Sequence, residues 1–261
     1  MEWIPAPVLT AWFFAVGLCI GSFLNVCIAR IPEERSVVFP PSACPRCSAR
    51  IRWYDNIPLL SYLLLLGRCR SCRGRISPVY PIVELVEGIT LAGLFARNGI
   101  SVELVRGLIF ISCLVVLFFI DLRHMILPNV ITFPCAVLGL LFSVLGAAPL
   151  RFVDALAGSC SGAAALLVVM GLYYLLRRRQ GMGTGDVKMM LSVGAFVGLK
   201  GALFTLVAAS LAGGLFSIGL LLAGRKFDSE VPFGCFLAPA AALAYVTASA
   251  PVDWYLSLLL G

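Results

Sequence analysis

The stretch VLTAWFFAVGLCIGSFLNVCIA, residues 8–29, contains no charged side chain. A transmembrane helix needs roughly 20 consecutive, mostly apolar residues, so this stretch is long enough to cross a bilayer. Seven further apolar runs follow, at residues 79–96, 104–120, 128–145, 153–176, 187–199, 202–223 and 233–246. The run at 187–199 is short and rich in glycine, so a broken or partly re-entrant helix is an alternative there. The pattern predicts about eight transmembrane helices.

The composition agrees with this prediction. Of the 261 residues, 61% are apolar and only 13% are charged, about half the usual charged share of roughly 25% in soluble domains. These figures exclude a soluble globular enzyme, a disordered chain and a disulfide-rich secreted module. Barrel strands would alternate apolar and polar residues, whereas these runs are unbroken. The expected fold class is therefore an all-α, polytopic helical membrane protein with a small polar loop.

The basic residues predict the orientation of the chain, because Lys and Arg concentrate in cytoplasmic loops. If the N-terminus is outside, 16 of the 20 basic residues lie inside. These are Arg30, Arg35, Arg46, Arg50, Arg52, Arg68, Arg70, Arg73, Arg75, Arg123, Arg177, Arg178, Arg179, Lys188, Arg225 and Lys226. We therefore expect a first transmembrane helix in residues 1–29, a cytoplasmic loop at 30–78 and further membrane helices at 79–261.

The net charge of +7 has two readings. One is topology combined with attraction to anionic lipids of the inner leaflet. The other is an acidic or nucleic-acid partner. No nucleic-acid-binding motif accompanies the arginines, so we expect membrane lipid and no nucleic acid as a partner.

Four of the ten cysteines lie in the polar loop, as two C-x2-C pairs separated by 21 residues. They are Cys44, Cys47, Cys69 and Cys72. Four thiolates at such spacing suit tetrahedral zinc, and a reducing cytoplasm disfavours disulfides. A metal would also stabilise a loop that is too small for a good core of its own. The pattern predicts a structural zinc site, with dithiol redox chemistry as the rival reading.

Two acidic residues border apolar runs in a shared context. Asp121 ends the run at 104–120, and Asp186 follows Gly181, Gly183 and Gly185 at the start of another run. Both are expected at the cytoplasmic face, where helix packing could bring them together. A close carboxyl pair shares one proton and can hydrolyse a peptide by general acid–base catalysis. Helix capping is the alternative role for each aspartate.

The ordered set of motifs resembles the type IV prepilin peptidase family of bifunctional leader peptidases and N-methyltransferases. The segments that carry the resemblance are GSFLNV (21–26), RIP (30–32), the two C-x2-C pairs with WYDNIP (53–58) and SY (61–62) between them, ISPVYP (76–81) with Glu84, Asp121 with LP (127–128), GTGD (183–186) with Lys188, and PFG (232–234). They cover nearly the whole chain. Cys235 stands where the family usually has proline.

The resemblance implies a G-x-G-D aspartic protease of the bacterial inner membrane, with Asp121 and Asp186 at the positions of the catalytic pair. It implies prepilins or pseudopilins as substrates, cleavage of a cytoplasmic leader, and methylation of the new N-terminus with S-adenosylmethionine. We assign Gly67 and Glu84 to this second activity, with a turn glycine and a helix-end acid as the alternatives. Peptidase activity without methyl transfer, a proton-coupled transporter and a zinc-bearing scaffold are the competing functions.

Overall fold

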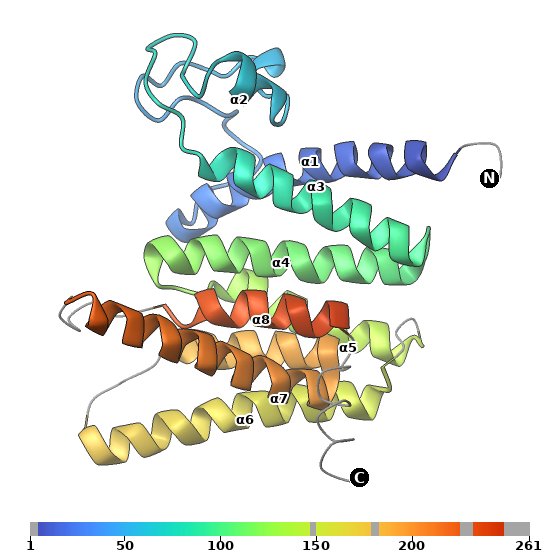
Figure 1. Ribbon diagram of the computed structural model, residues 1–261, viewed down its shortest axis with the longest axis vertical. Coiled ribbons are helices and arrows are strands. Elements are labelled where there is room, and N and C mark those ends of the chain that lie inside the picture. The colour runs from blue at the N-terminus through green and yellow to red at the C-terminus, as the bar shows by residue number, and fades with distance from the viewer. Residues whose placement is uncertain (1–4, 147–149, 179–182, 225–231, 248–261) are drawn as a thin grey trace. The chain divides into compact units, whose positions relative to one another are not determined.

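The computed structural model describes residues 5–146, 150–178, 183–224 and 232–247. Within these ranges regular structure is helical, apart from two isolated bridges, Ala43 to Arg50 and Arg68 to Arg75. The α-helices are α1 (Ala6–Arg30), α2 (Leu60–Leu64), α3 (Val79–Asn98), α4 (Val102–His124), α5 (Asn129–Val144), α6 (Phe152–Arg177), α7 (Thr184–Leu222) and α8 (Gly234–Thr247). Figure 1 shows their order along the chain. The all-α prediction is confirmed.

Five of the described helices are long and apolar enough to cross a membrane: α1, α3, α4, α6 and α7. The apolar helices α5 and α8 are shorter, with 16 and 14 residues. The sixth and seventh predicted runs are joined in α7, whose 39 residues are interrupted at Gly198. Gly198 has φ 70° and ψ −172°, a conformation that side-chain-bearing residues avoid. The run at 187–199 is therefore helical as far as Gly198, and the interruption lies where this run meets the next one.

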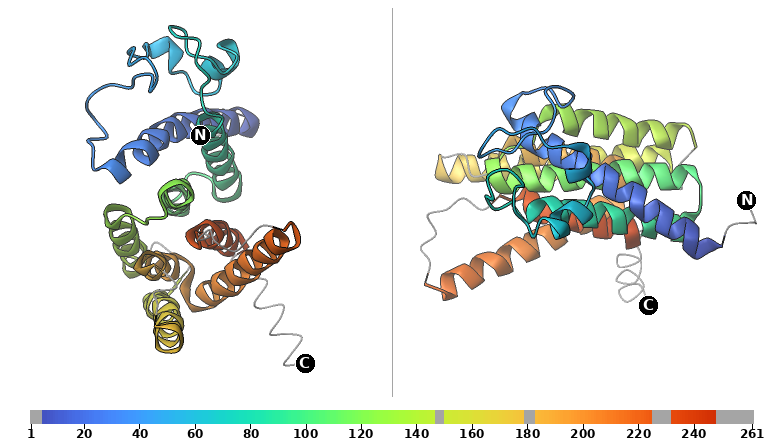
Figure 2. Two further views of the ribbon diagram at one scale, coloured as in Figure 1. Left: turned by 90° about the vertical axis from the view of Figure 1, so that its left-hand side faces the viewer. Right: turned by 90° about the horizontal axis from the view of Figure 1, so that it is seen from above.

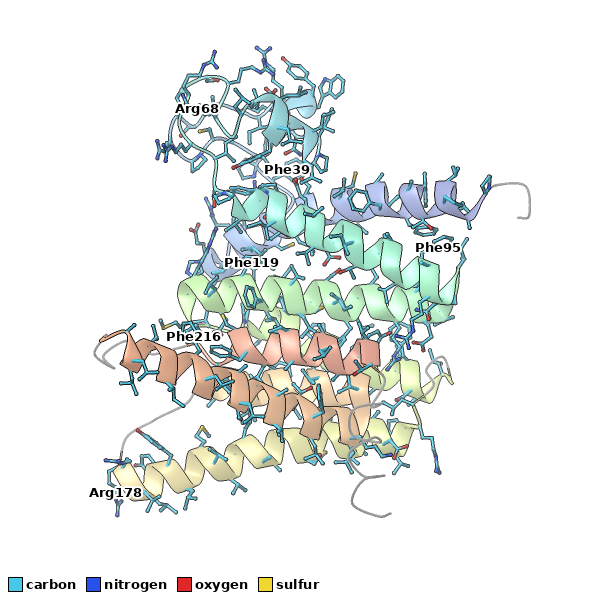
Figure 3. The ribbon with its side chains drawn as sticks, in the orientation of Figure 1. Phe39, Arg68, Phe95, Phe119, Arg178 and Phe216 are labelled. Atoms are coloured by element: carbon cyan, nitrogen blue, oxygen red, sulfur yellow. The ribbon has the colours of Figure 1, made fainter. Side chains whose placement is uncertain are left out.

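The described chain falls into two compact units, residues 1–108 and 109–261. In the first unit α1 packs against α3 through glycines. A Cβ at Gly21 would lie 2.6 Å from the Cα of Glu84, and a Cβ at Gly17 would lie 2.6 Å from the carbonyl oxygen of Glu87. Phe13 and Phe95 stack further along the same helix pair, with ring centroids 4.2 Å apart. Figure 3 labels Phe95 near the end of α3.

In the second unit α7 packs against α5, α6 and α8 (Figures 1 and 2). The backbones of α6 and α7 nearly touch, because a Cβ at Gly158 would lie 2.4 Å from the carbonyl carbon of Gly198. Phe196 fills the space on the other side and stacks on Phe110, with ring centroids 4.5 Å apart. These contacts position the first part of α7, which carries one of the two aspartates.

Several sequence predictions fall outside the described residues. They concern Gly181 in the glycine-rich run and three of the basic residues used for the orientation, Arg179, Arg225 and Lys226. The division of the chain at residues 29/30 and 78/79 follows its expected path through the membrane and stays a prediction.

Candidate active site and metal centre

The two aspartates come from opposite helix ends in the second unit. Asp121 lies in the last turn of α4, and Asp186 lies in the first turn of α7. Their exposed fractions are only 5% and 7%. Leu127 packs against Gly185, next to Asp186, and against Gly234, beside the carboxyl group of Asp121, so the two aspartates lie in one neighbourhood although 65 positions separate them in the sequence. Helix packing thus brings together the pair that the motifs singled out.

The start of α8 encloses the carboxyl group of Asp121. The backbone N–H of Cys235 donates a hydrogen bond to Asp121 Oδ2, with a donor–acceptor distance of 3.1 Å. A Cβ at Gly234 would lie 2.6 Å from the same oxygen. The thiol of Cys235 donates to the carbonyl oxygen of Phe118 at 3.6 Å. Cys235 therefore contacts α4 at two points, the carboxyl group of Asp121 and the backbone one turn before it.

Leu127 packs against the glycines beside both aspartates. A Cβ at Gly185 would lie 3.0 Å from the Cβ of Leu127, and a Cβ at Gly234 would lie 3.4 Å from Leu127 Cδ1. Leu127 is itself buried. Glycine at both positions therefore lets three segments meet, namely the end of α4 with its following turn, the start of α7 and the start of α8.

Polar contacts between α5 and α7 support this arrangement. Lys188 Nζ donates a hydrogen bond to Asn129 Oδ1 at 2.8 Å. One turn further along, Ser192 Oγ donates to the backbone carbonyl of Thr132 at 2.6 Å, in a fully buried position. Buried hydrogen bonds of this kind are costly to leave unmade, so they set the register of α7 and with it the position of Asp186. His124, the single histidine, is exposed at the end of α4.

A close carboxyl pair of this kind can catalyse hydrolysis without a covalent intermediate. One ionised carboxylate can take a proton from water while the other, protonated carboxyl polarises a carbonyl group. A pair that shares one proton titrates as a unit, so neither residue would have a fixed role as acid or base.

The four loop cysteines converge in the first unit. One sulfur from each of Cys44, Cys47, Cys69 and Cys72 lies within 4.8 Å of every other. The two C-x2-C turns share one geometry. The N–H of Cys44 bonds to the carbonyl of Ala49 at 3.0 Å, and the N–H of Cys69 bonds to that of Gly74 at 2.8 Å. The two pairs are therefore equivalent halves of one centre.

The cluster fits a tetrahedral metal. Zinc–sulfur bonds of about 2.3 Å give sulfur–sulfur edges of about 3.8 Å, and the sulfurs of Cys44 and Cys72 are 3.9 Å apart. The backbone N–H groups of Arg46 and Cys47 lower the pKa of the Cys44 thiol to about 6, whereas desolvation and the neighbouring thiols raise the pKa of Cys47 to about 11. A bound metal would hold all four sulfurs as thiolates. The donor set and its spacing can hold a metal ion.

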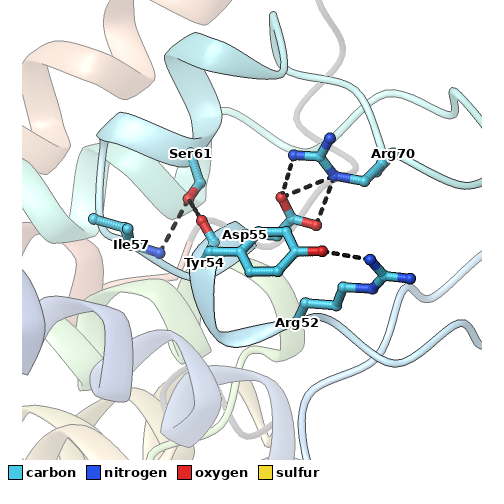
Figure 4. A network of polar contacts seen from close by, with 6 residues as sticks. All are labelled: Arg52, Tyr54, Asp55, Ile57, Ser61 and Arg70. Carbon is cyan, nitrogen blue, oxygen red and sulfur yellow. Dashed lines mark hydrogen bonds and ion pairs between the residues drawn. The ribbon is translucent and has the colours of Figure 1, made fainter.

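A polar network braces the same loop (Figure 4). The guanidinium of Arg70 donates to both carboxylate oxygens of Asp55, with an ion-pair distance of 2.6 Å, and lowers the pKa of that carboxyl. Arg52 donates to the hydroxyl of Tyr54. Ser61 Oγ accepts from the N–H of Ile57 and donates to the carbonyl of Tyr54, both at 3.0 Å. The segment between the cysteine pairs is thereby tied to the second pair and to α2.

Gly67 follows α2 by three residues, and Glu84 of α3 binds the residue that precedes α2. Gly67 has φ 65°, and its backbone packs against the ring of Tyr62, whose hydroxyl would lie 3.0 Å from a Cβ there. Glu84, in α3, is buried and accepts a hydrogen bond from the N–H of Leu59 at 2.8 Å. Both residues shape the loop around the cysteine cluster, in the unit that does not contain Asp121 and Asp186.

Gly234 and Cys235 contact Asp121, and Leu127 packs against Gly185 and Gly234 beside the two aspartates, but the sequence did not single out these three as site residues. The signals were the LP string at residues 127–128 and the PFG string at residues 232–234, which carried the family resemblance but no assigned role. A backbone donor leaves no side-chain pattern in a sequence, so the structure was needed to show that the start of α8 binds Asp121.

Two family models match the chain. The model of the bacterial peptidase A24 N-terminal domain matches residues 15–98, and that of the type IV leader peptidase family matches residues 108–218. The chain belongs to the type IV leader peptidase family. The first match contains the cysteine cluster with Gly67 and Glu84, and the second contains both aspartates. The resemblance drawn from the motifs is confirmed.

Curated relatives support this family assignment over most of this chain. A prepilin leader peptidase/N-methyltransferase of Aeromonas salmonicida is 37% identical over 95% of this chain and 94% of its own length. The protein of the same name from Myxococcus xanthus is 42% identical over 83% of this chain, which spans 64% of that relative. A third, from Klebsiella pneumoniae, is 40% identical over 77% of this chain and 90% of its own. No solved structure gives a significant match.

Proposed function

We propose that this protein is a multi-pass inner-membrane enzyme that cleaves the leader peptide from prepilins or pseudopilins and then methylates the new N-terminus. The names of the relatives support both activities. The observation that carries the peptidase activity is the meeting of two buried carboxyl groups, Asp121 and Asp186, at the ends of two apolar helices. Buried acidic residues in membrane helices are costly and usually functional.

The proposed cleavage uses the pair as one acid–base unit. The ionised carboxylate takes a proton from water, and the resulting hydroxide equivalent attacks the scissile carbonyl carbon. The protonated carboxyl donates its proton to the carbonyl oxygen. When the carbon–nitrogen bond breaks, the proton taken from water passes to the leaving amine. The hydrogen bond from the N–H of Cys235 holds Asp121 Oδ2 in place during these steps.

The placement of the pair at helix ends supports a substrate cleaved at the membrane edge. Asp121 is three residues from the end of α4, and Asp186 is in the first turn of α7. A prepilin whose apolar helix lies in the bilayer would present the junction with its polar leader at that level. With the N-terminus outside, this edge is the cytoplasmic one, where the polar loop with its excess of arginines also lies.

The methyltransferase activity is assigned to the first unit. S-adenosylmethionine would supply a methyl group to the free amine that cleavage produces, leaving S-adenosylhomocysteine. We propose that Gly67 and Glu84 serve this step, because Gly67 follows α2 and Glu84 binds the residue that precedes α2, in the unit that carries the cysteine cluster. Their present contacts shape the loop, so their contribution would be to hold the cosubstrate site in its binding conformation.

We further propose that the metal at the four cysteines is zinc and that its role is structural. All four positions of a tetrahedral ion are filled by protein sulfurs, which leaves none open for a substrate. The ion would join the two C-x2-C turns and so keep the loop folded.

The test is an intact-mass assay of a purified prepilin, with the enzyme in lipid nanodiscs and with or without S-adenosylmethionine. We expect loss of the leader mass in both conditions, and a further gain of one methyl group only with the cosubstrate. Gly67→Ala and Glu84→Gln should reduce the methylated fraction while cleavage continues. Cleavage without any methylation by the wild-type protein would leave a peptidase alone, and no loss of leader mass would refute the proposal.

A further inference from the structure

Four leucines of the polar loop are exposed together on and just after α2. Leu60, Leu63, Leu64 and Leu66 form this leucine patch, and their exposed fractions are 49%, 68%, 73% and 84%. Leucine side chains are costly to leave in water, and a contiguous apolar surface marks contact with a membrane or a protein. Nothing in the loop covers the patch, so its partner lies outside the loop.

The position of α2 along the axis of α3 indicates what covers the leucine patch. The N–H of Leu59, immediately before α2, donates to Glu84 Oε2 at 2.8 Å. Glu84 is five residues after Val79, where α3 begins, so it lies about 7–8 Å along the helix axis at 1.5 Å per residue. The 20 residues of α3 extend for about 30 Å, the thickness of the hydrocarbon core of a bilayer. The start of α2 therefore lies at the level of a residue about 7–8 Å inside the loop-side end of α3.

The ribbon diagrams agree with this position of α2 along α3. Figures 1 and 2 show α2 alongside the first turns of α3, on its flank, and α1, α2 and α3 belong to one compact unit. Helices that lie in a membrane interface bury their apolar face about 5–10 Å into the boundary between headgroups and acyl chains. The level of α2 falls within that range.

Four arginines follow the patch and complete an interfacial surface. Arg68, Arg70, Arg73 and Arg75 are all exposed. Arg70 is paired with Asp55, which leaves most of this charge uncompensated by the loop's own acids. Figure 3 places Arg68 in the loop, on the side of α2 toward the end at which α3 begins. Lipid phosphates lie at that side of the acyl chains, so the leucine patch and Arg68 follow the same order as the layers of a membrane.

We propose that the leucine patch is a membrane-interface anchor. Its side chains lie among the upper acyl carbons of the leaflet on the loop side, and the arginines bind the phosphates of anionic lipids. The anchor would hold the cysteine cluster against the bilayer, so that the loop is fixed at three points: α1, α3 and α2. This anchoring is a property of the enzyme without substrate and does not depend on the proposed peptidase activity.

Photocrosslinking in nanodiscs tests the proposal directly. The photoreactive amino acid p-benzoylphenylalanine would replace Leu64 or Leu66 in the full-length protein, in discs that contain phosphatidylcholine and phosphatidylglycerol. Tyr62 is the matched control, because it lies on the same helix and packs inward against Gly67. Ile89 is the positive control, since it is an exposed residue of the membrane helix α3. Metal content would be measured for each variant to confirm that the loop is folded.

After irradiation, we expect adducts of one phospholipid mass at positions 64 and 66, with a yield close to that at position 89 and several-fold above that at position 62. The absence of lipid adducts at both leucine positions, while position 89 reacts, would overturn the proposal. Crosslinks to the protein's own chain, or to an added prepilin in place of lipid, would overturn it as well, because the patch would then be a protein-binding surface.

The role of the arginines has a separate readout. Replacing phosphatidylglycerol by phosphatidylcholine should lower the adduct yield at position 64 at low ionic strength, and added salt should reduce the difference between the two bilayers. Equal yields in both bilayers would refute the part of the proposal that assigns anionic lipid to the arginines.

Discussion

At the scale of single residues, the carboxyl group of Asp121 is enclosed by backbone as much as by side chains. It accepts a hydrogen bond from the N–H of Cys235, and the missing side chain of Gly234 leaves room for it. Orientation of catalytic groups accounts for a large part of enzymatic rates, and small displacements are expensive. The glycine of the PFG string therefore has a positional role at the active site.

Gly234→Ala should strongly impair cleavage. Its new Cβ would lie 2.6 Å from Asp121 Oδ2, so the carboxyl group must move. A shift of about 1 Å can lower the rate by roughly 100-fold. The measurement is the rate of prepilin cleavage by the purified variant. Gly214→Ala is the matched control, because a Cβ at Gly214 meets nothing within 4 Å. Equal rates for the two variants would contradict this role of Gly234.

The residues whose side chains can transfer protons could be selected from the sequence. The residues that position those side chains could not. Asp121 and Asp186 were recognised because ionisable groups beside apolar runs are rare and lie within specific motifs. The donor to Asp121 is a backbone N–H 114 positions away. Every residue other than proline has such a group, so no residue type signals it.

At the scale of elements, α7 shows how a glycine-rich helix positions the site. It is interrupted at Gly198, and its first part packs so closely on α6 that a Cβ at Gly194 would lie 2.2 Å from the carbonyl carbon of Gly158. Small residues let helix backbones approach in this way within membranes. Hydropathy located both halves of α7 as apolar runs. The direction of the chain after Gly198 depends on backbone angles that hydropathy does not encode.

Gly158→Ala should destabilise the second unit. The added methyl group would lie 2.4 Å from the backbone of Gly198, where no flexible side chain can yield. Overpacking of this kind costs about 1–3 kcal/mol in the free energy of unfolding. Thermal unfolding in detergent would show a lower midpoint than for Gly171→Ala, a substitution on the same helix with open space around it. A midpoint unchanged from wild type would show that α6 and α7 do not pack as described.

Cys44→Ser should release the metal and loosen the polar loop. Three sulfurs are a poor tetrahedral site, and binding of the metal is coupled to folding of the loop. We expect a lower metal content by mass spectrometry and faster proteolysis between residues 30 and 78. Cys19→Ser, an exposed cysteine on α1 outside the cluster, is the control and should leave both unchanged. Full metal content in Cys44→Ser would rule out the four-sulfur site.

At the scale of the whole molecule, the composition and the few charged residues indicate the fold class and the orientation in the membrane. The apolar composition indicated the fold class, and the basic residues predicted its orientation. The packing of helices that are distant in sequence was beyond prediction from a single chain. In particular, the meeting of α4, α7 and α8 at the aspartates depends on glycines whose partners become visible only in three dimensions.

The predicted orientation can be measured with reporter fusions. Alkaline phosphatase fused after Gly99, between α3 and α4, should be active because this connection is expected outside the cytoplasm. The same reporter fused after Cys47 should be inactive, since the polar loop with its arginines is expected inside. The reverse pattern would place the N-terminus in the cytoplasm and the aspartates at the opposite face.

The most direct test of the central claim is the rate of prepilin cleavage by Asp121→Asn and by Asp186→Asn in nanodiscs. Each substitution keeps the size of the side chain and removes one member of the acid–base pair. The same change at Asp154, an exposed acid of α6, is the control. We expect a loss of at least roughly 100-fold for each member of the pair, and a rate near wild type for Asp154→Asn. Cleavage at the wild-type rate by either Asp121→Asn or Asp186→Asn would contradict the account.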